Sequence, residues 1–255
     1  MAYRLLSLRG FSSDMINLDA PEWWAQLPVL TGPNVYLREV ESADVETLFE
    51  VLTDPQVSRY ISPPPPSPAA FEGFIEWAQR QRKAGMCVCF AVVPKGLNHA
   101  IGLFQVRALE PSFQTAEWGF AMGASFWSTG LFLEAATLVV EFAFTMMGVH
   151  RLEARAVVDN VRGNRALEKL GAKGEAELRK AFRRKDPQFL WAIVDKEWTV
   201  PKVPPRTVFD AAKIKRQIER AIAQRTRNAF GESAGPARPF PFFLTDPSDD
   251  TPDDE

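Results

Sequence analysis

The stretch that decides the fold covers residues 149–172 and reads VHRLEARAVVDNVRGNRALEKLGA. Apolar and charged side chains alternate over residues 151–158, and this period of two is typical of a strand with one buried face. Asn160 follows at the position of a helix N-cap, residues 161–170 have the spacing of a short helix, and Gly171 is placed to end it. A strand that leads directly into a helix favours a mixed α/β fold.

Immediately upstream, a predicted strand over residues 115–122 leads through a turn into a long predicted helix over residues 130–147. The apolar positions of that helix recur with a period of 3.6, and Gly148 is placed as its C-cap. The first N–H groups of a helix have no intrahelical partner, and the helix dipole is positive there. The turn before this helix is therefore a candidate anion site.

The remaining segments extend the same pattern in both directions. Ser42 and Ser67 are the expected N-caps of two further helices, and residues 54–55, Asp-Pro, are expected to stop the first of them. Strands are predicted over residues 35–40, 86–94, 100–109, 175–182 and 188–195. The resulting order, β-α-α-β-β-β-α-β-α-β-β, suits only the mixed α/β class.

Composition excludes several classes of protein. In 255 residues, 30 Lys and Arg are balanced by 32 Asp and Glu, so the chain lacks the basic surplus typical of nucleic-acid-binding proteins. Two cysteines and two histidines are too few for a disulfide framework or a histidine-rich metal site, and no metal is expected. Cys87 and Cys89 share one face of a predicted strand, where packing is the favoured role.

No segment has the pattern of a membrane span or a signal peptide. The longest apolar helix candidate, residues 137–149, contains Glu141 and is shorter than the roughly 20 residues that a span needs. Residues 1–10 hold only a short apolar stretch. We therefore expect a cytoplasmic protein with no membrane partner.

The pattern divides the chain into four parts. Residues 33–199 carry the regular elements and form the expected domain, and residues 1–32 are an N-terminal extension. Residues 200–234 form a basic helical extension, and residues 235–255 form a proline-rich acidic tail that is expected to be disordered. Docking of the basic helix on the domain is the favoured interpretation, with contact to RNA kept as the alternative.

Residues 149–172 resemble the signature of the GNAT superfamily of N-acetyltransferases. Within it they resemble the RimJ/RimL branch, which acetylates the N-termini of ribosomal proteins. The matching residues are Arg151, Ala154, Asn160, Arg165, Glu168, Lys169 and Gly171. With further matches upstream and downstream, the resemblance covers about residues 35–198. It implies an α/β GNAT fold, in which a mixed, mostly antiparallel, twisted sheet has splayed central strands and flanking helices.

The resemblance also implies acetyl-CoA as co-substrate and assigns residues to it. The pantetheine arm is expected to pair with the backbone of the splayed strand at Phe120, Ala121 and Met122. The pyrophosphate is expected on the following turn, which is formed by Trp127, Ser128, Thr129, Gly130, Leu131 and Phe132. Asn160 and Arg165 complete the expected cofactor-binding set, with a plain N-cap as the alternative role of Asn160.

The implied chemistry is direct transfer, in which an amine attacks the thioester carbonyl. Glu117 matches a strand glutamate that is proposed as general base in this family, directly or through a water; its alternative role is that of a solvated strand residue. Only a neutral amine attacks, and an α-amino group (pKa about 7.7–8) loses its proton more readily than a lysine side chain (pKa about 10.4). A peptide or protein N-terminus is the favoured acceptor because the RimJ/RimL branch uses it. The assembly is left open between monomer and homodimer.

Several residues depart from the family pattern. Trp127 occupies a position where Gln or Arg is usual, and Phe132 occupies one where the residue is small. Gly163 replaces a serine that is proposed to protonate the leaving thiolate, and Leu167 stands where other branches carry a catalytic Tyr. These departures keep a second hypothesis open, a catalytically impaired GNAT-fold module that binds acyl-CoA or a protein partner.

Overall fold

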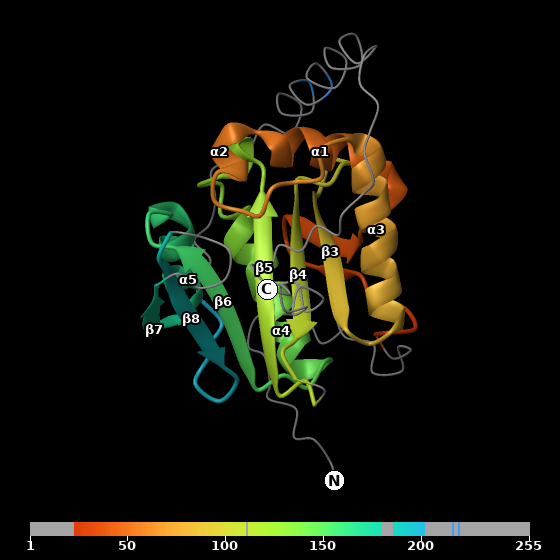
Figure 1. Ribbon diagram of the computed structural model, residues 1–255. Coiled ribbons are helices and arrows are strands. Elements are labelled where there is room, and N and C mark those ends of the chain that lie inside the picture. Colours follow the sequence, from red (N-terminus) through yellow and green to blue (C-terminus); the bar gives the residue numbers. More distant parts are fainter. Residues whose placement is uncertain (1–22, 111, 180–185, 202–215, 217–218, 220–255) are drawn as a thin grey trace, which may run out of the picture.

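An eight-stranded sheet extends through the described part of the chain, in the order β1-β2-β3-β4-β5-β6-β8-β7 (Figure 1). The computed structural model describes residues 23–110, 112–179, 186–201, 216 and 219. The strands are β1 (Leu30–Thr31), β2 (Val35–Glu39), β3 (Cys87–Pro94), β4 (Gly102–Ala108), β5 (Thr115–Met122), β6 (Arg151–Val157), β7 (Lys173–Leu178) and β8 (Gln188–Val194). Neighbouring strands are antiparallel except β5 and β6, which are parallel.

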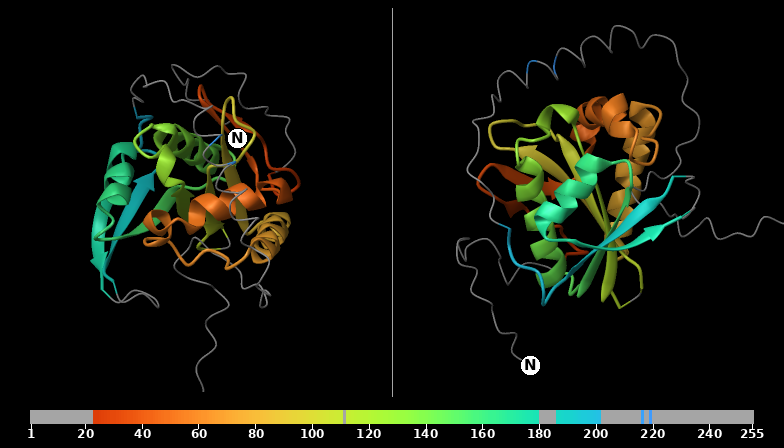
Figure 2. Two further views of the ribbon diagram at one scale, coloured as in Figure 1. Left: turned by 90° about the horizontal axis from the view of Figure 1, so that it is seen from above. Right: turned by 90° about the vertical axis from the view of Figure 1, so that its left-hand side faces the viewer.

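Helices cover both faces of this sheet (Figure 2). They are α1 (Val45–Thr53), α2 (Pro55–Ser58), α3 (Pro68–Lys83), α4 (Leu131–Thr145) and α5 (Val161–Leu170), with single 3-10 turns at Ser42–Asp44 and Ala124–Phe126. Helices α1 and α3 pack on one face, and α4 and α5 pack on the other. The predicted α/β class, with a mostly antiparallel sheet and flanking helices, is confirmed.

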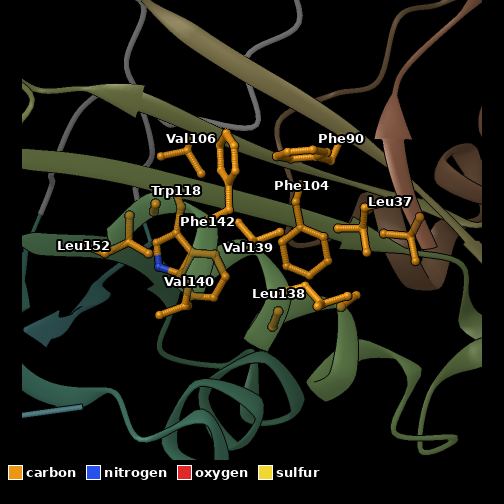
Figure 3. Close-up of a cluster of buried hydrophobic side chains, with 14 of the residues drawn as sticks. Leu37, Phe90, Phe104, Val106, Trp118, Leu138, Val139, Val140, Phe142 and Leu152 are labelled. Carbon is orange, nitrogen blue, oxygen red and sulfur yellow. The ribbon is translucent and has the colours of Figure 1, made fainter. Parts of the chain in front are cut away.

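Two apolar cores hold these layers together. The first lies between the sheet and α4 (Figure 3), and its buried members include Leu37, Phe90, Phe104, Trp118, Val139 and Phe142. The second lies on the opposite face, where Leu48 of α1 and Phe74 of α3 pack with Leu103 of β4. Because β3 is buried on both faces, its sequence is apolar throughout instead of alternating.

The two central strands, β5 and β6, separate after a short common ladder. β5 pairs with β4 along nearly its whole length, from Ala116 to Met122. With β6 it pairs only at residues 115–117, opposite residues 151–153. Beyond Glu117 the two strands diverge (Figure 1), while β6 continues its pairing with β8. The splayed central strands that the sequence predicted are therefore present.

The start of α1 differs from the prediction. Ser42 does not cap the helix but begins a 3-10 turn, and α1 starts at Val45. The buried carboxylate of Asp44 explains the difference. It accepts two hydrogen bonds from the Arg38 guanidinium and one from the N–H of Glu41, and so ties the turn to β2.

The predicted stop at residues 54–55 is confirmed, since α1 ends at Thr53, and the same two residues begin α2. Oδ1 of Asp54 accepts a hydrogen bond from the N–H of Gln56 at 2.8 Å, and Pro55 occupies the first helical position, where its missing N–H is tolerated. The predicted cap of α3 is confirmed, since the hydroxyl of Ser67 accepts a hydrogen bond from the N–H of Ala70 at 3.1 Å.

Much of the two predicted extensions lies outside the described residues. This holds for residues 1–22, for the acidic tail over residues 235–255, and for the basic extension apart from residues 200, 201, 216 and 219. Trp23 and Leu27, from the end of the N-terminal extension, are buried in the core beside α4. None of the helices within the described ranges has the length and apolar character that crossing a membrane requires.

Candidate functional site

A cleft opens where β5 and β6 separate, with about 580 Å³ of empty space, its open mouth included. It is lined by Tyr60, Ile61, Glu117, Trp118, Gly119, Phe120, Arg155, Ala156, Val157, Asn160 and Gly163. The walls are therefore β5 on one side, β6 and the start of α5 on the other, and the segment after α2 over both. Three residues predicted from the sequence meet in this cleft, namely Glu117, Phe120 and Asn160.

The backbone of β5 presents polar groups to the cleft. Successive residues of a strand direct their N–H and C=O groups to opposite sides. The carbonyl of Gln114 accepts a hydrogen bond from the N–H of Arg151 at 3.0 Å, so the even-numbered residues of β5 face β6. Met122 agrees with this alternation, since its carbonyl accepts a hydrogen bond from Nε1 of Trp127 at 2.8 Å. The N–H and C=O of Phe120 therefore face the cleft, where an extended ligand can pair with them.

Glu117 lies at the inner end of the cleft, at the last pair of the ladder between β5 and β6. Its side chain is only 2% exposed, so the alternative of a solvated strand residue is wrong. Oε2 accepts hydrogen bonds from Nε of Arg107 at 3.1 Å and from Nη2 at 2.6 Å, and Oε1 accepts one from Arg155. We call these three residues the inner charge cluster, in which two guanidinium groups fix the orientation of one carboxylate.

Charges continue to alternate along this face of the sheet. Arg155 lies 3.9 Å from Glu153, and Arg151 lies 2.8 Å from Glu153 and 2.5 Å from Glu175. The hydrogen bonds between Arg151 and Glu175 lower the pKa of the carboxyl and raise the pKa of the guanidinium. Side-chain exposure rises from 2% at Glu117 to 41% at Glu175, so the row of charges runs from a buried end to a solvent-exposed end.

The start of α5 lines the cleft through Asn160 and Gly163 and also contacts the turn before α4, which is not itself part of the lining; we call this contact region the outer end of the cleft. Arg162 of α5 joins the two, because its guanidinium carbon lies 4.5 Å from the ring centroid of Trp127 and its Nη1 lies 3.4 Å from Oγ of Ser128. The indole N–H of Trp127 is already bonded to the carbonyl of Met122. Trp127 therefore offers this end of the cleft a ring face and no hydrogen-bond donor.

The turn before α4 carries N–H groups that suit an anion. Ser128 and Gly130 have φ of 60° and 73°, and no hydrogen bond among the described residues uses the N–H of Ser128, Thr129 or Gly130. These groups stand at the positive end of a 15-residue helix. Glu134, in the first turn of α4, is directed elsewhere, since its carboxylate accepts hydrogen bonds from Asn34 and the N–H of Val35.

Phe132 packs into the core instead of obstructing the cleft. Its ring lies 4.7 Å from that of Phe120 and 5.6 Å from that of Phe104, between ring centroids. Leu131 is buried in the same core, and neither residue is among those that line the cleft. The large side chain at position 132 is therefore compatible with a ligand on the preceding turn.

The start of α5 forms the third boundary of the cleft. Asn160 both caps the helix and lines the cleft, with its Oδ1 accepting a hydrogen bond from the N–H of Gly163 at 2.9 Å. A Cβ on Gly163 would lie 2.5 Å from Nδ2 of Asn160, so a larger residue needs this cap to move. Arg165 is exposed and is not a lining residue, and Leu167 is fully buried in the core.

The other predicted residues of β5 play different parts. The side chain of Ala121 packs with the core under α1 and α3, and that of Met122 packs with the core under α4. Cys87 and Cys89 are buried, as their predicted packing role requires, and burial raises the pKa of the Cys87 thiol to about 12. Across the described ranges, no three His, Cys, Asp or Glu side chains come together as a metal site would require.

Sequence reasoning missed Tyr60, Ile61, Arg107 and Arg155 as residues at the cleft. Arg155 had a usable signal, since it lies on the polar face of an alternating strand. Arg107 had none, because its position opposite Glu117 depends on the register between β4 and β5. Tyr60 and Ile61 reach the cleft through the fold of the segment after α2, which no local pattern reports.

Comparison with protein families gives a match to an acetyltransferase (GNAT) domain over residues 34–173. Among curated proteins, the chain is 27% identical over 157 residues to "Uncharacterized N-acetyltransferase YoaA" of Bacillus subtilis (strain 168), and the match covers 60% of this chain and 86% of that protein. It is 24% identical over 166 residues to "Uncharacterized N-acetyltransferase p20" of Bacillus licheniformis, and the match covers 64% of this chain and 93% of that protein.

Solved structures share the fold at lower identity. RimJ of Mycobacterium smegmatis in complex with CoA-disulfide matches with a TM-score of 0.59 and 16% identity, over 78% of this chain and 94% of that chain. Ribosomal-protein-S5-alanine acetyltransferase from Vibrio fischeri matches with a TM-score of 0.59 and 17% identity, over 68% of this chain and 99% of that chain. The overall fold of the present chain therefore has counterparts in solved structures.

Proposed function

Because the chain belongs to the GNAT family of acetyltransferases, we propose that it transfers an acetyl group from acetyl-CoA to a primary amine of a peptide or protein N-terminus. The observation that carries the proposal is the cleft between β5 and β6. There the backbone groups of Phe120, which pair with no described residue of β6, lie between a fixed carboxylate and the start of α5, which contacts a turn whose N–H groups no described residue uses. A polar, extended, anionic ligand such as acetyl-CoA suits this arrangement of polar groups along the cleft.

The pantetheine arm and the pyrophosphate of acetyl-CoA each have a proposed partner. The N–H and C=O of Phe120 pair with the pantetheine amides, as a neighbouring strand would. The N–H groups of residues 128–130 hold the pyrophosphate at the positive end of α4. Asn160 contacts the pantetheine arm from the opposite wall. The rest of the set expected from the sequence stays part of the proposal, although these residues do not line the cleft: Ala121, Met122, Trp127, Leu131, Phe132 and Arg165.

The proposed chemistry places the thioester beside Glu117. The amine nitrogen forms a bond to the thioester carbonyl carbon, the C–S bond breaks, and the thiolate leaves with a proton. A backbone N–H of the splayed strand that does not pair with pantetheine is the expected donor to the oxyanion that forms on the carbonyl oxygen. An ion cluster that is already fixed needs no rearrangement when charge develops next to it.

We assign the role of general base to Glu117, acting through a water. A carboxylate offers about four lone-pair positions, and the three hydrogen bonds from Arg107 and Arg155 use three of them. At pH 7 the Glu117→Gln variant is expected to lower kcat about 100-fold. Above about pH 8 an α-amino group is already neutral and needs no base. The defect is therefore expected to shrink as pH rises, whereas a loss that is independent of pH would assign Glu117 a structural role only.

The acceptor is tested with two matched peptides that contain one internal lysine, one with a free N-terminus and one with that N-terminus blocked. The full chain and acetyl-CoA are expected to release CoA with the free peptide alone, and mass spectrometry is expected to find the acetyl group on the α-amine. Peptides with different first residues extend the panel. Acetylation of the lysine in both peptides would overturn the proposed acceptor.

A second candidate function is an acyl-CoA-binding or protein-interaction module without turnover. Two observations favour it: Gly163 offers no hydroxyl beside the cleft, and Leu167 is fully buried in the core. Neither position can supply a proton to the leaving thiolate, so that role falls to water or to another group. CoA binding without release of CoA for any amine is the result that selects this module.

Several wider expectations belong to the same proposal. We keep residues 33–199 as the catalytic-type domain, with the flanking segments as extensions. RimJ/RimL-like use of a ribosomal protein as acceptor is supported by likeness of fold to such enzymes and by the residues quoted above. A cytoplasmic location, the absence of a membrane partner, and RNA contact by the basic extension remain expectations from the sequence.

A further inference from the structure

Arg162 reaches from the start of α5 to the turn before α4. It is the second residue of α5, and its guanidinium lies over the ring of Trp127, which belongs to the turn before α4. A planar guanidinium on an aromatic face keeps its N–H groups free at the edge while the contact limits its motion. Its Nη1 lies 3.4 Å from Oγ of Ser128, a long contact that places the charge beside the N–H groups of that turn.

No carboxylate of the described residues neutralises the charge of Arg162. Among the described residues no carboxylate pairs with Arg162, and the first turn of α5 contains no acidic residue. Glu134, the acid in the first turn of α4, is 4% exposed and bonded to residues 34 and 35. The guanidinium of Arg162 therefore lies close to the N–H groups of residues 128–130 and to the positive end of α4.

We propose that Arg162 is a further cofactor-binding residue, whose guanidinium holds the pyrophosphate of acetyl-CoA from the wall opposite α4 while Trp127 supports it. The inference rests on the proposed acetyl-CoA site. The forked N–H groups of Arg match two phosphate oxygens, and the charge adds to the N–H groups of residues 128–130. Trp127 contributes only its ring, because its N–H is bonded to Met122. The bound pyrophosphate then links α5 to the turn before α4.

The test is calorimetric titration of CoA and of 3′-dephospho-CoA into the full chain. Arg162→Ala is expected to weaken binding of both ligands about tenfold and to the same degree, because both keep the pyrophosphate. Lys169→Ala is the matched control, since it removes one positive charge from an exposed position in the last turn of the same helix. This control is expected to bind both ligands as the wild type does.

A double-mutant cycle tests the supporting role of Trp127. Trp127→Ala is expected to weaken CoA binding several-fold in the wild type and to add little in the Arg162→Ala background, because the supported group is already absent. Trp127→Phe keeps a ring face and is expected to retain most of the affinity. If the losses of CoA affinity in the two single variants simply add in the double variant, Trp127 does not act by supporting Arg162.

Two outcomes overturn the role of Arg162. One is an Arg162→Ala variant that binds CoA as tightly as the wild type. The other is a loss seen with CoA but not with 3′-dephospho-CoA, because this would place the contact on the 3′-phosphate. If the wild type itself binds no CoA, the proposed function fails and not only the assignment of Arg162.

Discussion

Arginine guanidinium groups lie at both ends of the cleft, but they differ in burial and in whether a carboxylate pairs with them. At the inner end, Arg107 and Arg155 are nearly buried and bonded to the carboxylate of Glu117. At the outer end, Arg162 is exposed and lies on the ring of Trp127, and among the described residues it has no carboxylate partner.

This difference suits the two ends of the cleft to different roles. Buried charges that satisfy one another hold their positions, because moving any of them leaves another without its partner. An exposed guanidinium on an aromatic ring can exchange water for a phosphate oxygen at little cost. In our account the inner end orients the reacting groups, and the outer end captures the anionic part of the donor.

Removal of Glu117 is the strongest way to break the inner end. Glu117→Ala leaves two nearly buried guanidinium groups without their carboxylate, and we expect the free energy of unfolding to fall by about 3–5 kcal/mol. Urea unfolding followed by circular dichroism measures the change. Glu168→Ala, at an exposed position of α5, is the control and is expected to stay within about 0.5 kcal/mol of the wild type. A Glu117→Ala variant as stable as this control would contradict the fixed inner cluster.

A side chain at Gly163 tests the boundary between the two ends. Gly163→Ser places a Cβ 2.5 Å from Nδ2 of Asn160, so we expect the cap of α5 to shift and the free energy of unfolding to fall by about 1 kcal/mol. Asn160→Ala is expected to cost a similar amount, because it removes the same cap. Thermal unfolding of the double variant supplies the control. If the two losses of unfolding free energy simply add in the double variant, the clash with Asn160 is not the cause of the loss in Gly163→Ser.

The exposed end of the charge row is expected to show the smallest effect. The pKa of Glu175 is lowered from 4.5 by its hydrogen bonds to Arg151, so its ion pair contributes stability above pH 4.5 and loses it as pH falls through the folded-state pKa. Because the side chain is 41% exposed, Glu175→Gln is expected to cost only about 0.5 kcal/mol at pH 7.

The pH dependence provides the check on this pair. The difference between Glu175→Gln and the wild type is expected to disappear near pH 3, where the carboxyl is protonated in both the folded and the unfolded chain. Glu177→Gln changes an exposed residue of the same strand and is the matched control, with no expected effect. If Glu175→Gln lowered the free energy of unfolding as much as Glu117→Ala does, the buried and exposed ends of the charge row would not differ in their contribution to stability.

The elements around the cleft were predictable because their signals are local. Alternation over residues 151–158, the cap at Asn160 and the glycine at 171 predicted β6 and α5 to within a residue. The candidate site was predictable in part, since Glu117 and Phe120 follow from the resemblance of the chain to its family.

What the sequence did not reveal depends on contacts between distant segments. Arg107 reaches Glu117 only because of the register between β4 and β5. The direction of the Phe132 ring is set by Phe104 and Phe120, so a residue that seemed large for the pyrophosphate turn fills the core instead. Such contacts are properties of the packed molecule and leave no periodic trace in the chain.

The central claim is that acetyl-CoA lies along the splayed strands and on the turn before α4. Hydrogen–deuterium exchange of the full chain, with and without CoA, tests it most directly. CoA is expected to slow exchange at the N–H groups of Phe120, Ser128, Thr129 and Gly130, and to leave exchange in β3 unchanged. Binding of CoA that leaves exchange at all four of these amides unaltered would contradict the account.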